Sequence, residues 1–147
     1  MYGDTAAMRK RAAQLREQGT DVRALADRLV ARLENLDWQG RAAADMRSRI
    51  HDRAAVLRDC AGQHENAAET LERHLTEVDR LKDAISTTER KASSLVTDAR
   101  TRIAQLDRHD DPAGVTREPA DGDRFLDQFV PPKPGHKDWL TVTLPGL

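Results

Sequence analysis

The positions of its prolines restrict this chain more than any other feature. All six lie at or after Pro112, so none interrupts the first 111 residues. A proline inside a helix removes a backbone hydrogen bond and costs about 3 kcal/mol. We therefore expect a helical domain over residues 1–111 and a Pro-rich tail over residues 112–147.

Apolar residues recur at intervals of seven within the proline-free region. A repeat sustained over this length is typical of helices in left-handed, coiled-coil contact. The sequence therefore predicts an all-α fold, with a first helix over about residues 4–36 and a second over about 41–106. The first series is Met8, Leu15, Val22, Leu29 and Leu36, and the second is Ala43, Ile50, Leu57, His64, Leu71, Val78, Ile85, Ala92, Ala99 and Leu106.

The link between the two helices, residues 37–40, is short enough to make them antiparallel neighbours in a hairpin. If Leu36 faces Ala43, then Gly19 faces residues 60–62, where small side chains would let the two backbones approach closely. The alternative is that Gly19 marks a break, with Thr20 capping a new helix.

The two helices differ greatly in length. At 1.5 Å per residue the first spans roughly 50 Å and the second roughly 100 Å, so the first covers the second only to about Leu75. The apolar residues beyond need another partner, either a third helix folded back after a break at residues 85–89 or the helices of another chain. A two-helix core is thin, which favours a four-helix-bundle-type dimer. The predicted partner interface comprises Val78, Leu81, Ile85, Leu95, Ile103 and Leu106.

The charge and composition narrow the class of partner. There are 24 basic and 25 acidic residues, so no overall field favours nucleic acid or an anionic membrane. No apolar run approaches the roughly 18 residues of a membrane span, and the first residues lack the apolar segment of a signal peptide. We expect synthesis in the cytoplasm and no cleaved signal.

No catalytic or cofactor-binding motif is present, so we expect neither an enzyme nor a cofactor. None of the five histidines has Glu or Asp three residues before it, and His64 and His74 are too far apart to form a helical metal pair. We interpret His64 as a residue of the helix seam. Cys60 is the only cysteine, and we interpret it as a buried thiol, with an intersubunit disulfide as the alternative.

The tail contains three of the five aromatic residues, which a purely disordered segment would not need. We expect a short apolar turn at residues 125–130 and, from the alternation over residues 139–144, a strand-like end. Docking on the second helix, recognition by a partner, and disorder are the alternatives for the tail. The candidate recognition residues are Phe125, Phe129 and Trp139.

The link itself reads Trp38-Gln39-Gly40. Gly40 suits a turn conformation, and Trp38 could plug the open end of the two-helix core. A tryptophan and a glycine at this spacing, between two heptad helices, resemble the WXG family, the ESAT-like small substrates of type VII (ESX) secretion systems. The resemblance covers about residues 4–85, and the second helix is longer than in the smallest members.

The resemblance implies a non-catalytic secretion substrate or escort whose tip is shaped by Trp38 and Gly40. The implied partners are another WXG-like protein or a second copy of this chain, the type VII machinery, and possibly a secreted toxin. Family export signals often read Tyr-x-x-x-Asp/Glu after the second helix, but the only tyrosine here is Tyr2, followed four residues later by Ala6. The departure favours escorted export to the cell envelope or outside. The alternative function is a cytosolic homodimeric coiled-coil scaffold.

Overall fold

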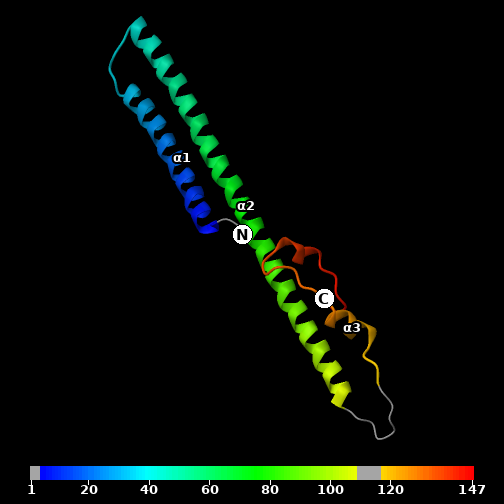
Figure 1. Ribbon diagram of the computed structural model, residues 1–147. Helices are drawn as coiled ribbons and strands as arrows, with labels where there is room; N and C mark the ends of the chain where they lie inside the picture. The colour runs from blue at the N-terminus through cyan, green and yellow to red at the C-terminus, as the bar shows by residue number, and fades with distance from the viewer. Residues whose placement is uncertain (1–3, 109–116) are drawn as a thin grey trace. The chain divides into compact units, whose positions relative to one another are not determined.

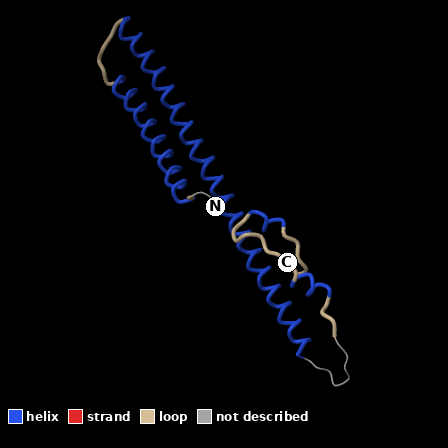
Figure 2. The backbone as a smooth tube through the Cα atoms, viewed as in Figure 1, coloured by secondary structure: helices blue, strands red, loops and turns tan. Residues whose placement is uncertain are grey.

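The computed structural model describes residues 4–108 and 117–147. These residues are mostly helical and contain no strand, which confirms the all-α prediction (Figures 1 and 2). The elements in chain order are α1 (Thr5–Glu34), α2 (Arg41–Arg108), α3 (Asp121–Asp127) and the 3₁₀ helix η1 (Lys137–Thr141).

Helix α1 begins at a side-chain cap and continues without interruption. The Asp4 carboxylate accepts hydrogen bonds from the backbone N–H groups of Ala6 and Ala7 at 3.0 and 3.1 Å, which satisfies two of the free donors at the helix start. Gly19 lies inside the helix and is buried, so it does not mark a break.

Helix α2 is also continuous, through residues 85–89 as well. The third helix that a break at those residues would have produced is therefore not formed. The absence of proline and the Ala-rich composition favour this uninterrupted run, although Ser86, Thr87 and Thr88 are individually poor helix formers.

The chain divides into two compact units, the first ending at Glu77 and the second beginning at Val78. The boundary therefore lies inside α2 and not near residue 111, where the sequence suggested it. The physical reason is that the tail packs on α2: Leu126, Trp139 and Leu144 are buried together with Ile85, Ala92 and Ala99 of that helix.

In the first unit α1 packs beside the opening half of α2 through small residues (Figure 1). Alanine and glycine occupy the buried centre, because small side chains allow two helix backbones to approach closely. The larger residues of the predicted seam flank this central row and are partly buried, except Met8 and Leu36, which are exposed. The central row comprises Ala12, Gly19, Ala26 and Leu33 of α1 with Ala54, Ala61, Ala68 and Leu75 of α2.

The end of the tail is not a strand. Residues 137–141 form η1, whose start is capped by the His136 ring nitrogen accepting from the Asp138 N–H, and Trp139 is buried while Leu140 is 44% exposed. No neighbouring strand is available among the described residues to pair with the segment. The helical turn instead directs the indole onto α2, so the strand-like end predicted from the alternation over residues 139–144 is wrong for residues 137–141.

Candidate interaction surfaces

The loop between α1 and α2 turns at Gly40. Its φ of +105° lies in the left-handed region, where a side chain would be strained. Its carbonyl accepts a hydrogen bond from the Ala44 N–H at 3.1 Å, so the turn leads directly into the first turn of α2. The Arg47 guanidinium donates to the Trp38 carbonyl at 2.6 Å and fastens the loop to that helix.

Trp38 does not plug the end of the core as expected. Its side chain is 49% exposed, and the neighbouring Leu36 is 55% exposed. Leu33 and Ala43 are the residues buried at this end of the helix pair, at 3% and 1% exposed. The loop therefore presents two large apolar side chains to solvent.

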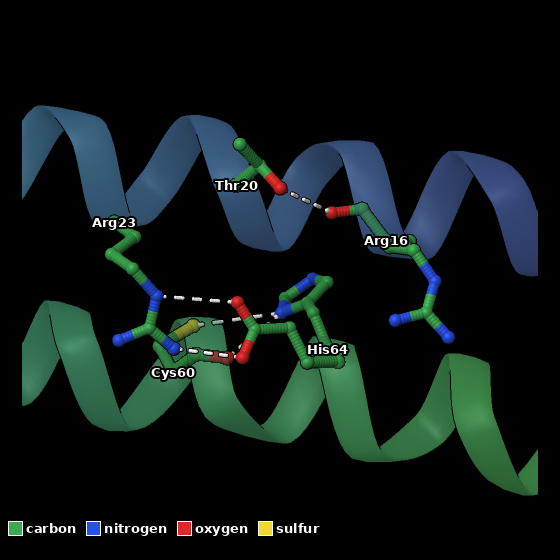
Figure 3. A network of polar contacts seen from close by, with 6 residues as sticks. Arg16, Thr20, Arg23, Cys60 and His64 are labelled. Atoms are coloured by element: carbon green, nitrogen blue, oxygen red, sulfur yellow. Dashed lines mark hydrogen bonds and ion pairs between the residues drawn. The ribbon is translucent and has the colours of Figure 1, made fainter.

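One side of the α1–α2 pair is lined by ion pairs. These pairs are formed by residues that follow a member of the central row by four positions. Arg16 donates to Glu72 at 2.6 Å, and Arg23 donates to Glu65 at 2.7 Å. Arg23 extends from α1 toward α2 in Figure 3. Because a step of seven residues along α1 matches a step of seven back along α2, the helices run in opposite directions.

Hydrogen bonding to these carboxylates raises the pKa of both arginines, with a smaller contribution from the charge of each partner. The arginines therefore remain fully charged, and the pairs persist across the physiological pH range. Both pairs are solvent-exposed, so each contributes little to the stability of the helix pair. Their structural effect is to cover this side of the central row with charge.

The opposite side of the pair is apolar. The side chains three positions after each residue of the central row lie on this side. A step of three residues along a helix points to one side of the starting residue, and a step of four points to the other side, where the ion pairs lie. Leu25 and Met46 extend this side and are each 45% exposed. The partly buried side chains of this apolar side are Leu15, Val22, Leu29, Leu57, His64 and Leu71.

His64 and Cys60 lie within the apolar side. The His64 Nδ1 is 3.0 Å from the Cys60 carbonyl oxygen and 3.9 Å from its sulfur (Figure 3). Both side chains are partly buried. The contact lies within one turn of α2, so it orients the imidazole. The described residues contain no cluster of three or more potential metal ligands around it or elsewhere.

In the second unit the tail is fastened to α2 at several points. Arg102 pairs with Asp123 at 2.6 Å, and Arg100 pairs with Asp127 at 3.0 Å. Hydrogen bonding to Arg102 holds the pKa of the Asp123 carboxyl below its ordinary value, against the opposing effect of desolvation. The Gly135 N–H donates to Glu89 at 3.3 Å, at the other end of the contact.

Trp139 is the centre of the tail contact. It is 3% exposed, its Nε1–H donates to the Lys133 carbonyl at 3.1 Å, and its ring meets Phe129 edge to face with centroids 6.2 Å apart. The three predicted recognition residues therefore lie in different environments. Trp139 and Phe129 face α2, whereas Phe125 is 55% exposed.

The six residues of the predicted partner interface also lie in different environments. Ile85 is buried by the tail and Leu95 packs against the same cluster, so part of the row that was expected to meet another chain meets this chain's own tail. The other four residues are partly buried: Val78, Leu81, Ile103 and Leu106.

A groove of about 350 Å³ remains between α2 and the tail. Ala92 and Val96 lie on its α2 side, and Phe129, Pro132 and Trp139 line the tail side. The central row of α2 and its alanines, which carried little signal in the sequence, are the features that sequence reasoning missed. A search for alanine at seven-residue intervals, 54, 61 and 68, would have found them.

No helix among the described residues is both long and apolar enough to cross a membrane. Comparison with protein-family models, with curated proteins and with solved structures found no match. The surfaces described above are therefore the basis for any assignment of function.

Proposed function

We propose that this chain is a non-catalytic helical binding protein of the WXG type, which serves as a substrate or escort in type VII secretion. Its α1–α2 hairpin pairs with the hairpin of another WXG-like chain, or of a second copy, in a four-helix bundle. The single observation that carries the proposal is the difference between the two sides of the helix pair.

One side of the pair is covered by the Arg16–Glu72 and Arg23–Glu65 ion pairs, and the other carries partly buried leucines with Leu25 and Met46 almost half exposed. A side that is charged along its length suits solvent. An apolar side of two helices suits burial against another helix pair, because each Å² of apolar surface removed from water contributes about 25 cal/mol.

The secretion role rests on the WXG resemblance of the loop. The exposed Trp38 ring beside Leu36 gives the tip an apolar surface that a recognition partner can bind, and Gly40 holds the turn that presents it. Because the tyrosine motif is missing, we infer that the chain is exported together with a partner that supplies the export signal. The destination is the cell envelope or the exterior.

A charge placed on the apolar side tests the bundle. Leu25→Glu puts a carboxylate into the proposed interface, and Val56→Glu is the matched control, since Val56 is 64% exposed and lies away from both sides. Light scattering of each protein, alone and mixed with a candidate WXG-like partner protein, should show loss of the complex only for Leu25→Glu. Equal behaviour of the two variants would contradict the assignment of the interface.

Fractionation of cells tests the secretion role separately. The protein should reach the envelope or medium only when a WXG-like partner that binds it is expressed, and Trp38→Ala should reduce its export without abolishing the complex. The second candidate, a cytosolic homodimeric scaffold, is favoured by the same apolar side. It is the better assignment if the protein dimerises alone and remains in the cytosol in both cases.

A further inference from the structure

We propose that the apolar side of the α1–α2 pair takes a different chain and not a second copy. Its partner is a helical protein whose own apolar surface is bordered by Asp and Glu. The inference rests on the proposed function, which leaves the partner between a different chain and a second copy. It deepens that function by assigning the chemistry of the partner from the charges that border the apolar side.

Two rows of side chains border the apolar side, one on each helix. They contain the residues immediately before the central row and recur every seven residues. The 3.9 Å contact between Cys60 Sγ and His64 Nδ1 shows that the row of α2 adjoins the apolar side chains. We call these the border rows: Arg11, Gln18, Leu25 and Arg32 on α1, and Met46, Arg53, Cys60, Ala67 and His74 on α2.

The charge in the border rows is of one sign. Arg11, Arg32 and Arg53 carry it, and His74 adds to it where it is protonated. Each arginine has an apolar residue of this side three positions before it and four after it, and such residues are neighbours on a helix surface. Neither the border rows nor the side chains between them include Asp or Glu. Asp4 precedes α1 and caps that helix with its carboxylate.

The border arginines are also free to meet a partner. Arg11, Arg32 and Arg53 are exposed, and none of them makes an ion pair or a side-chain hydrogen bond within the described part of the chain. On the opposite side three arginines are already paired within the chain, as Arg16–Glu72, Arg23–Glu65 and Arg58–Asp27. The acidic groups of the helix pair are therefore used on the opposite side and are missing where the apolar side needs them.

This asymmetry decides what the apolar side can meet. An arginine beside an apolar surface covers it with its aliphatic stem and keeps its charge at the margin. Charges that flank an apolar seam between helices select the partner. A second copy brings only basic and uncharged border residues, so no ion pair forms between the borders of two copies in any orientation, and arginines repel one another where they meet.

A partner with Asp or Glu in its own border rows turns each of these repulsions into an attraction. The preference depends on placement and not on overall charge, because the formal net charge of the whole chain is only -1. Opposite charges at the margin of an apolar contact also speed the encounter of the two proteins. The apolar side therefore supplies the contact area, and the border arginines supply the choice of partner.

The test uses a charge-reversed copy of this chain as the acidic-bordered partner. The variant Arg11→Glu, Arg32→Glu, Arg53→Glu keeps the apolar side and places carboxylates in the border rows. Sedimentation velocity at low salt should show the unmodified protein and the variant as monomers when each is alone, and a doubling of mass when they are mixed. Raising the salt concentration about tenfold should weaken the mixed complex roughly tenfold, because its ion pairs lie at an exposed margin.

A matched control reverses three basic residues outside both sides of the helix pair. Lys10→Glu, Arg28→Glu, Arg73→Glu changes the net charge by the same amount at exposed positions, and this variant should not bind the unmodified protein. Circular dichroism should show the same helix content for both variants. An unchanged mass for the mixture with the border variant, or equal binding of the control, would overturn the proposal.

Two outcomes separate this proposal from the bundle on which it rests. Dimers of the unmodified protein that Leu25→Glu abolishes would overturn the acidic partner and leave the apolar side as the bundle interface. Leu25→Glu in the unmodified protein should also abolish its complex with the border variant. A complex that survives this substitution would lie elsewhere on the chain and would contradict both the acidic partner and the bundle.

Discussion

Two glycines inside helices allow a direct measurement of how closely α1 approaches α2. A β-carbon built on Gly19 would lie 3.0 Å from the Ala61 carbonyl oxygen and 3.0 Å from Glu65 Cγ, whereas one built on Gly62 would have no atom within 4 Å. Both residues lie in helices of the same unit. Gly19→Ala and Gly62→Ala therefore add the same methyl group in a crowded and an open position.

Replacing a mid-helix glycine by alanine stabilises the helix by about 1 kcal/mol through backbone entropy. Gly62→Ala should therefore raise the free energy of unfolding by this amount. Gly19→Ala gains it too, but the Ala61 carbonyl is backbone and cannot move without displacing the helix, and overpacking of this kind costs about 1–3 kcal/mol. The two variants should therefore differ by about 1–3 kcal/mol in free energy of unfolding, with Gly62→Ala the more stable.

Urea unfolding followed by circular dichroism measures this difference, provided that the m-value is the same for both variants. Because the chain has two units, the transition assigned to the first unit should be the one that moves. Equal stabilisation by the two substitutions would refute the close approach of α1 and α2 at Gly19, and with it the packing of the two helices through the central row.

Three further predictions concern the tail and the loop. Trp139→Ala should destabilise the second unit by about 3–5 kcal/mol and speed proteolysis of the tail, whereas the matched Leu140→Ala, at a side chain 44% exposed, should change little. Because the pKa of Asp123 is depressed in the folded chain, its contribution is complete above the ordinary carboxyl pKa and is lost as the pH falls below about 4. Trp139 fluorescence in a Trp38→Phe background should report the loosening of the tail at low pH, and Asp123→Asn should reduce that pH dependence. Gly40→Ala should lower stability by about 1–3 kcal/mol in thermal unfolding, since φ is +105° there, and an unchanged midpoint would argue against that strained turn.

The helical character of the chain could be predicted because it depends on local signals. The absence of proline before residue 112 and the seven-residue apolar repeat act within one segment, and the structure places α1 at Thr5–Glu34 and α2 at Arg41–Arg108 against expected limits of 4–36 and 41–106. Gly40 is the residue that a turn with positive φ requires, which is again a local property.

The central row of the helix pair was harder to find. The repeat of leucine and valine suggested a seam of large residues, but the structure buries Ala54, Ala61 and Ala68 at the centre and leaves the larger side chains at the flank. Alanine carries little hydrophobic signal of its own. Its place in the core depends on how near the second helix comes, which no property of a single segment specifies.

By itself, the sequence determined that the chain forms long helices, that a glycine turn separates the first two, and that three of the five aromatic residues lie in the tail, for which docking on a surface was one of three alternatives. The tertiary structure decided that α2 provides that surface, that Trp139 is reached by a 3₁₀ turn and not by a strand, and that charge covers one side of the α1–α2 pair. The division has a physical reason: helix formation follows from residues three and four apart, whereas burial depends on which distant side chains meet.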